Sequence, residues 1–156
     1  MFSPFLREGE IVMRILNING KEYEFEFSFA AAEHGELVQK MFNVLTGAYI
    51  IKAGAKSQSD AMIDGVSNMV ADIPHICNTA FYAGLLENNE VDVVTAKKLM
   101  HSYMKENGKS YSSMFEELKT FMEEDGFFDL SGLTEMIQRM SQSAEEVIKP
   151  KKSRTK

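Results

Sequence analysis

The sequence contains 156 residues, 44% hydrophobic and 26% charged, a composition typical of one globular domain and unlike that of disordered or collagenous chains. Its net charge of -6 conceals an asymmetry: residues 149–156 carry five of the 17 basic side chains, so residues 1–148 hold 12 basic against 23 acidic ones. Such an acidic body repels phosphate backbones, which excludes nucleic-acid binding outside the short basic tail, and a single cysteine excludes an intrachain disulfide.

We expect the chain to divide into three parts. Arg7-Glu8-Gly9-Glu10 is what purine-rich codons encode, and it lies just before Met13, which resembles a translated ribosome-binding site. We therefore expect translation to begin at Met13 and residues 1–12 to be a disordered leader. Residues 13–140 are expected to form a single globular domain and residues 141–156 a flexible basic tail. No apolar run approaches the roughly 20 residues that span a bilayer, so we expect no membrane association.

Residues 14–29 carry the pattern of a β-hairpin. Ile15 and Ile18 precede Asn19-Gly20, a pair suited to a two-residue type I′ turn because both residues tolerate positive φ. After the turn, aromatic residues alternate with glutamates, in the order Glu22, Tyr23, Glu24, Phe25, Glu26 and Phe27. An isolated hairpin is marginal in water, so we expect the aromatic row to pack against helices and the glutamate row to face water.

The middle of the chain predicts three helices. Apolar residues recur at helical spacing between residues 30 and 50, before a break at Gly54: Leu37, Val38, Met41, Phe42, Leu45 and Tyr49. A second helix is predicted from an N-cap at Ser59 to the residue before Pro74, and it buries Met62, Ile63, Val66, Met69, Val70 and Ile73. A third is predicted to start at Pro74, since proline fits a first turn, and to carry Ile76, Ala80, Ala83 and Leu86 up to a loop at residues 87–89.

Three further helices complete the prediction. Asp92 is expected to cap a helix that ends at Asn107-Gly108 and carries Val93, Ala96, Leu99, Met100 and Tyr103. Ser113 and Glu116 predict a capping box for the next, which ends at Gly126 and carries Met114, Phe115, Leu118, Phe121 and Met122. A short last helix, capped by Asp129 or Ser131, carries Leu133, Met136, Ile137 and Met140. The predicted fold class is α+β, predominantly α: an N-terminal β-hairpin followed by a bundle of about five or six helices.

We identify no catalytic, metal-binding or cofactor-binding residues, and we expect no enzymatic activity. His75 and Cys77 come nearest to a ligand pair, but residues two apart on a helix point to different faces. An ordinary histidine and a buried cysteine are therefore expected. His34 and His101 stand alone, the acidic clusters suit solvated helix faces, and the glycines form no phosphate-binding motif.

Eleven methionines and eleven phenylalanines, without tryptophan, are the most unusual feature of the composition. Methionine fills cores, but its flexible side chain also suits surfaces that mould themselves to partner helices. Consecutive aromatic residues in the connector at residues 127–130 cannot all face one core, so we expect an exposed patch there. The predicted partner-binding residues lie around this connector: Phe121, Met122, Phe127, Phe128, Leu130, Leu133, Met136 and Met140.

In the order of these features, the sequence resembles the tail assembly chaperones of long-tailed bacteriophages that infect Gram-positive hosts. The resemblance covers most of residues 13–140. It begins with MRILNINGKEYEFEFSF, of which NINGKEY is the strongest piece, and it continues through the acidic, Met/Phe-rich helical body to the Lys-rich end.

This resemblance implies a protein that coats the tape measure protein, keeps its hydrophobic helices soluble, helps recruit tail tube subunits and then leaves the finished tail. It implies a location in the host cytoplasm and absence from the mature virion, and we further expect self-association along the client. Members of the group are often made in two lengths by a programmed ribosomal frameshift, for which the codons of Lys151-Lys152 are the obvious place.

Two other functions fit the same acidic helical character. One is another small structural adaptor, such as a head–tail connector component, whose gene would lie beside the portal gene rather than the tape measure gene. The other is a transcription regulator that uses the basic tail, which predicts DNA binding with a steep dependence on salt.

Overall fold

The computed structural model describes residues 13–47 and 58–148, with side chains described for residues 13–47 and 67–142. The expected leader, Tyr49, Gly54 and the tail beyond residue 148 lie outside this part of the chain, as do the side chains of residues 58–66. The described residues are mostly helical and begin with a two-stranded antiparallel hairpin, which confirms the predicted fold class. None of their helices is long and apolar enough to cross a membrane.

Strands β1 (Ile15–Ile18) and β2 (Lys21–Glu24) form the predicted hairpin. Asn19 and Gly20 have φ values of 55° and 80°, the positive values that a type I′ turn requires. Leu16 and Ile18 are buried, whereas Ile15 is 44% exposed, so β1 turns one face toward the helices and the other toward solvent.

Phe25 and Phe27 follow β2 and are completely buried, as the aromatic pattern predicts, while Tyr23 is half-buried. The Phe25 ring lies at the centre of an aromatic cluster, with its centroid 5.3, 5.0 and 5.9 Å from those of Phe27, Phe81 and Phe121. Gly84 makes this position possible, because a Cβ atom there would lie 2.3 Å from the Phe25 ring. The Glu26 amide also donates a hydrogen bond to the Gly84 carbonyl, at 2.9 Å.

The helical stretch predicted between residues 30 and 50 is two helices, α1 (Phe29–Ala32) and α2 (Gly35–Thr46). His34 interrupts the stretch as the N-cap of α2, and α2 ends at Thr46, followed by the C-cap Gly47 with a φ of 72°. The predicted apolar face is present on α2, but only Leu37 and Met41 are fully buried. The rest of that stripe remains partly accessible.

Helix α4 runs from Gln58 to Leu86 with Pro74 inside it, so the prediction of two helices separated at Pro74 is wrong. Proline removes one backbone hydrogen bond, to the carbonyl of Val70, at a cost of about 3 kcal/mol. Val70 is 54% exposed, contrary to the prediction that it is buried, and solvent can therefore reach that side of the helix. On the other side, Ile73, Ile76 and neighbouring residues are buried, and this packing holds the helix together through the proline.

Helix α5 (Val93–Glu106) starts and ends where the sequence predicts, with the Asp92 side chain accepting from the Thr95 amide at 2.7 Å. Val93 is not part of its buried stripe, being 56% exposed in the first turn. Helix α6 (Tyr111–Glu124) ends before Gly126 as predicted, but its N-cap is Ser110. The expected cap, Ser113, is instead the third residue of the helix, and it forms a capping box with Ser110.

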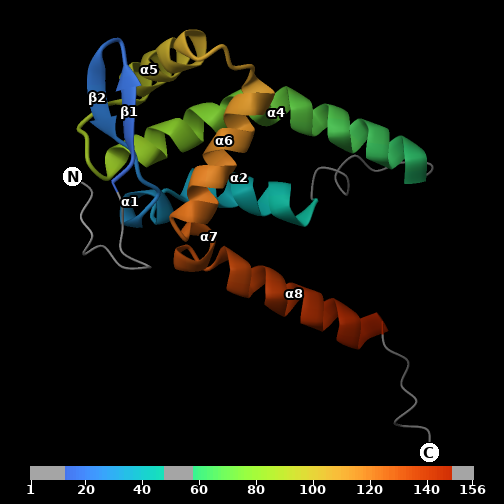
Figure 1. Ribbon diagram of the computed structural model, residues 1–156. Coiled ribbons are helices and arrows are strands. Elements are labelled where there is room, and N and C mark those ends of the chain that lie inside the picture. Colours follow the sequence, from blue (N-terminus) through green and yellow to red (C-terminus); the bar gives the residue numbers. More distant parts are fainter. Residues whose placement is uncertain (1–12, 48–57, 149–156) are drawn as a thin grey trace, which may run out of the picture.

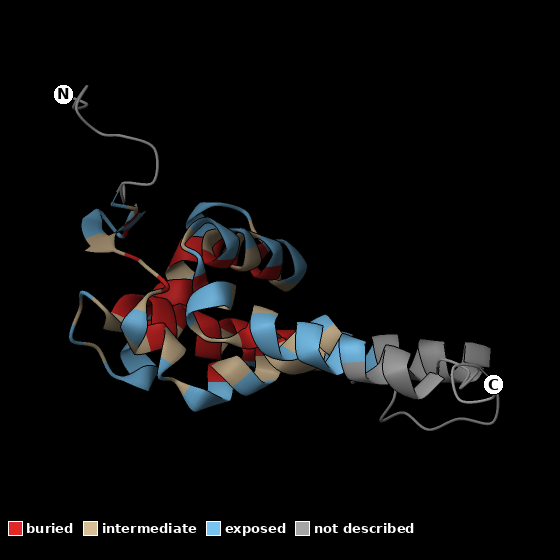
Figure 2. Ribbon diagram, turned by 90° about the horizontal axis from the view of Figure 1, so that it is seen from below, coloured by how far each residue is buried: buried red, intermediate tan, exposed pale blue. Residues whose placement is uncertain are grey.

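The residues predicted as a connector form a short helix, α7 (Phe127–Leu130), and α8 (Leu133–Ile148) is longer than expected. Residues 141–148 belong to this helix, whereas the sequence analysis assigns them to the tail. Figure 1 shows the hairpin beside α4 and α5, α6 crossing the bundle, and α8 leaving it. The buried residues gather in the centre of the bundle, and the described length of α8 is largely exposed (Figure 2).

Arg14, just before β1, ties the hairpin to the end of α6. Its guanidinium donates to both carboxylate oxygens of Asp125, at 2.8 and 3.0 Å, and to Glu124 at 3.0 Å, and it lies 4.0 Å above the Phe121 ring centroid. Asp125 also accepts from the Phe27 amide at 2.9 Å. Burial lowers the pKa of Arg14, but the hydrogen bonds to Asp125 and Glu124 outweigh it and raise that pKa above its ordinary value. Arg14 therefore remains charged and paired.

Candidate protein-binding surface

An apolar groove of about 390 Å³ lies between α2 and the start of α8. Val38 and Phe42 line it from α2, and Leu133 and Met136 from α8. Val38 and Phe42 lie next to the buried residues Leu37 and Met41 on the apolar stripe of α2, but they are themselves only partly buried. The lining residues together are Ala32, Gly35, Val38, Gln39, Phe42, Ser131, Gly132, Leu133 and Met136.

A second hollow, of about 370 Å³, lies along another flank of α8. Its apolar lining comes from Leu45 on α2, Phe128 on α7 and Ile137 on α8, and its polar rim includes Lys119 and Glu123 on α6. The first two turns of α8 therefore lie between two hollows. Both are wide enough for side chains of another helix. The first is lined mainly by apolar residues, whereas the second has three apolar residues and four polar ones around it.

The predicted partner-binding residues separate into two groups. Met122 and Phe127 are 1% and 0% exposed and belong to the core, and Leu133 is 4% exposed but borders the first groove. Leu130, Met136 and Met140 are 43%, 48% and 47% exposed, and Phe121 and Phe128 are half-buried.

Helical periodicity alone does not explain this division, because residues three apart share a face of a helix. Phe127, the first residue of α7, packs into the core with its ring 5.8 Å from that of Phe27, whereas Leu130, the last residue of α7, is exposed. Phe128 lies between these extremes, packed edge-on against Phe127 at 5.6 Å and open to the second hollow. The expectation of an accessible apolar residue in this segment is thus met by Leu130 and in part by Phe128.

The sequence analysis did not assign Val38, Phe42 and Leu45 to a partner surface. A signal was present, because these residues follow one another at intervals of four and three and widen the apolar stripe beyond Leu37 and Met41. From the sequence alone, a wide stripe is equally explained by a thicker core. Only the position of α8, which leaves α2 incompletely covered, distinguishes a partner surface from a thicker core.

His34, Glu36 and His75, which are distant in the sequence, line a common pocket of about 230 Å³. His75 Nε2 is 2.8 Å from a Glu36 carboxylate oxygen, and His34 Nδ1 accepts from the Leu37 amide at 3.3 Å. Each histidine thus has a nitrogen engaged in a structural contact. Among the side chains that the structure describes, those of residues 13–47 and 67–142, no group of three His, Cys, Asp or Glu residues is placed to hold a metal ion.

Cys77 lies on a different side of α4 from His75, as its position two residues further on predicts. It is fully buried, and its thiol donates to the Tyr111 carbonyl at 3.6 Å. Burial raises the pKa of Cys77 to about 12, which removes the thiolate that nucleophilic or metal-binding chemistry would need at neutral pH.

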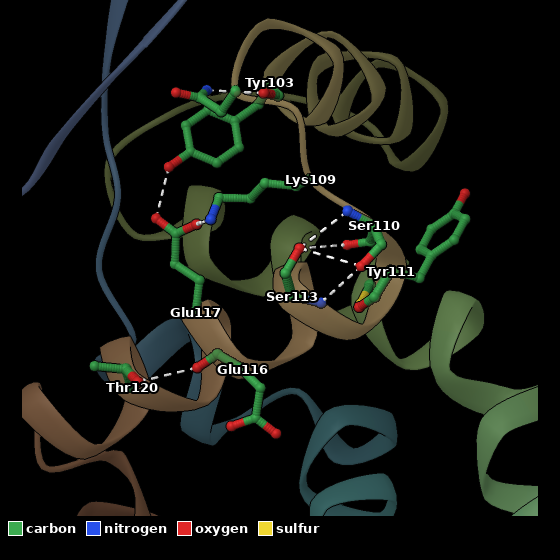
Figure 3. A network of polar contacts seen from close by, with 10 residues as sticks. Tyr103, Lys109, Ser110, Tyr111, Ser113, Glu116, Glu117 and Thr120 are labelled. Atoms are coloured by element: carbon green, nitrogen blue, oxygen red, sulfur yellow. Dashed lines mark hydrogen bonds and ion pairs between the residues drawn. The ribbon is translucent and has the colours of Figure 1, made fainter.

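A polar network joins α5 to α6 across their connecting turn (Figure 3). The Glu117 carboxylate accepts from the Tyr103 hydroxyl at 2.6 Å and pairs with the Lys109 ammonium at 2.7 Å. Burial and the contact with Glu117 raise the pKa of Tyr103. Because each of these groups is paired with another and none lines a hollow described above, we regard the network as structural.

Neither a protein-family model, nor a curated protein, nor a solved structure matches this chain.

Proposed function

We propose that this chain is a tail assembly chaperone of a long-tailed bacteriophage, which binds the tape measure protein, keeps it soluble and helps recruit tail tube subunits. The observation that carries the proposal is the pair of hollows on either side of α8, together with the exposed side chains of Met136 and Met140. The order of sequence features that resembles this family supports the choice of client.

The geometry suits a client in the form of an amphipathic helix. A helix presents anchors at intervals of three and four residues, and a groove between two helices receives such anchors. Full burial of a methionine or phenylalanine side chain contributes roughly 1.5–3 kcal/mol before ordering costs are subtracted. Since the side chains here start half-exposed, each contributes less than this, and several copies along a long client are needed for tight binding.

Charge is consistent with such a role. Residues 1–148 carry 23 acidic and 12 basic side chains, and this excess of negative charge opposes precipitation when many copies surround a hydrophobic client. The exposed methionines add adaptability, because an unbranched thioether adjusts to client helices of different sequence.

The proposal is tested by co-expression with the tape measure protein of the same phage, whose gene the proposal expects to lie beside the gene of this chain. We expect the tape measure protein to move from the pellet to the soluble fraction. If it remains in the pellet when this chain is abundant and folded, the chaperone proposal is wrong.

A matched pair of variants locates the surface. Met136→Ser with Met140→Ser is expected to reduce client capture. Val93→Ser with Val94→Ser, which alters apolar side chains on α5 that are somewhat more exposed, is expected to leave it unchanged. Equal capture by both variants would place the client elsewhere on the molecule.

A further inference from the structure

The pocket of about 230 Å³ that His75 lines has a row of polar side chains along one wall. His75, Asn78, Thr79 and Tyr82 follow one another on α4 at intervals of three, one and three residues, which places them on one face of that helix. The N-terminal ends of α2 and α5 supply the other lining residues. None of the residues that line this pocket lines either hollow beside α8, so the pocket is separate from the proposed client surface.

Two adjacent polar side chains in this row lack a hydrogen-bond partner among the residues that the structure describes. Thr79 is only 7% exposed, and its hydroxyl makes no hydrogen bond within the described part of the chain. By contrast, the hydroxyls of Thr46 in α2 and Thr120 in α6 donate to the carbonyl four residues earlier, at 2.8 and 3.0 Å. Asn78 Oδ1 is shielded from solvent and also has no donor within reach in the described residues. Because an unpaired buried polar group destabilises the folded chain, a ligand explains this pair better than packing does.

The pocket combines donors and acceptors without a net charge. Lys97 contributes an ammonium group and Glu36 a carboxylate, so the two charges on its lining cancel while both histidines are neutral. His34 Nδ1 accepts from the Leu37 amide at 3.3 Å, which leaves Nε2 to carry the proton of the neutral ring as a donor. An uncharged ligand that both donates and accepts hydrogen bonds matches such a lining, whereas an anion or a cation would meet one repelling charge.

We infer that this pocket binds a primary carboxamide, the group at the end of a glutamine or asparagine side chain. A carboxamide has one carbonyl acceptor and two N–H donors, so it can pair with the Asn78 amide in either orientation of that amide and with the Thr79 hydroxyl. The volume of the pocket lies below the roughly 300–1,000 Å³ of sites for drug-sized ligands, which suits a group of side-chain size. Asn78 and Thr79 therefore select the ligand, and the free chain is less stable for keeping them unpaired.

Titration of the full chain with L-glutamine, followed through the NMR signal of the Thr79 methyl group, tests the binding. We expect saturation with a Kd on the order of 1 mM, which is typical of a ligand with about ten non-hydrogen atoms. L-Glutamate and L-ornithine are of similar length but replace the carboxamide by an anion and a cation, and they should bind at least about tenfold more weakly. N-Acetyl-L-glutamine N-methylamide identifies the source of the carboxamide. If it binds as well as glutamine does, the ligand is a side chain of another protein, and if it does not bind, the ligand is the free amino acid.

Thr79→Val distinguishes a ligand contact from a structural role. Valine has the shape of threonine but no hydroxyl, so we expect this variant to bind glutamine at least about tenfold more weakly while its Tm stays equal or rises. Thr46→Val is the matched control, because the Thr46 hydroxyl is already bonded to the Phe42 carbonyl, and this variant should bind glutamine normally and gain no Tm. No saturation by glutamine, equal binding of glutamate or ornithine, or full binding by Thr79→Val overturns the inference. None of these measurements involves α8 or a client, so such a failure leaves the proposed function standing.

Discussion

The close packing of Phe25 against Gly84 makes a quantitative prediction about Gly84→Ala. Gly84 lies inside α4, where alanine is favoured over glycine by about 1 kcal/mol on helix propensity alone. However, the added Cβ would lie 2.3 Å from one Phe25 ring atom and 2.5 Å from another. The ring would have to move by more than 1 Å to reach an ordinary carbon–carbon contact of about 3.5–4.0 Å.

Other contacts of Phe25 and its neighbours oppose that movement of the ring. Phe25 is completely buried within its aromatic cluster, and the hydrogen bond from Glu26 to the Gly84 carbonyl holds the two segments together. Overpacking of a core by added methyl groups costs typically 1–3 kcal/mol, and here the contact is closer than most. We therefore expect Gly84→Ala to lower the free energy of unfolding by about 2 kcal/mol, which corresponds to a loss of roughly 4–8 °C in Tm.

The assay is urea unfolding followed by circular dichroism, with two comparisons. Gly35→Ala, at the start of α2, meets nothing within 4 Å and is expected to be neutral or stabilising. Phe25→Leu combined with Gly84→Ala is expected to be less destabilised than the sum of the two single variants, because the smaller side chain relieves the clash. If Gly84→Ala behaves like Gly35→Ala, the hairpin does not pack on α4 in this way.

Three further predictions follow from other contacts. Arg14→Ala should lower the free energy of unfolding by about 2–3 kcal/mol, because Arg14 and Asp125 are only 16% and 19% exposed and the Asp125 carboxylate would lose its partner. Arg139→Ala breaks an ion pair with Glu135 that is about two-thirds exposed, and it should change the free energy of unfolding by less than about 0.5 kcal/mol. Urea titrations that rank the two variants equally would contradict this. Cys77 should react with iodoacetamide at pH 8 only after denaturant is added, as judged by mass spectrometry, and fast labelling of the folded chain would show that its burial is incomplete. Phe128→Ala should weaken client capture and also lower the Tm by a few degrees, because this ring is half-buried against Phe127; a large cooperative loss of Tm would assign Phe128 to the core alone.

The methionines illustrate how a composition can serve two purposes. The buried ones are Met41, Met100, Met104, Met114 and Met122, and the exposed ones include Met136 and Met140. The interior therefore takes more of the described methionines than the surface does. What remains at the surface is nevertheless concentrated on α8, where a partner can reach it.

Features governed by neighbouring residues were predictable from the sequence. Asn19-Gly20 determines a type I′ turn through its own backbone preferences, and Asp92 and Gly126 mark the start of α5 and the end of α6 through hydrogen bonds and φ values that involve only adjacent residues. The alternation around Phe25 likewise predicts a buried row, because one face of a hairpin must be covered.

Features that depend on contacts between distant residues were not predictable from the sequence. Pro74 is a helix breaker by local rules, yet α4 continues through it because residues beside it are buried against other helices. The sequence also did not show how the Met/Phe stripes divide into core and surface, since Phe127 is completely buried and Leu130, in the same short helix, is 43% exposed. Periodicity tells which side chains share a face of a helix, but the free energy of covering that face comes from the element packed against it, and only the tertiary structure decides which element that is.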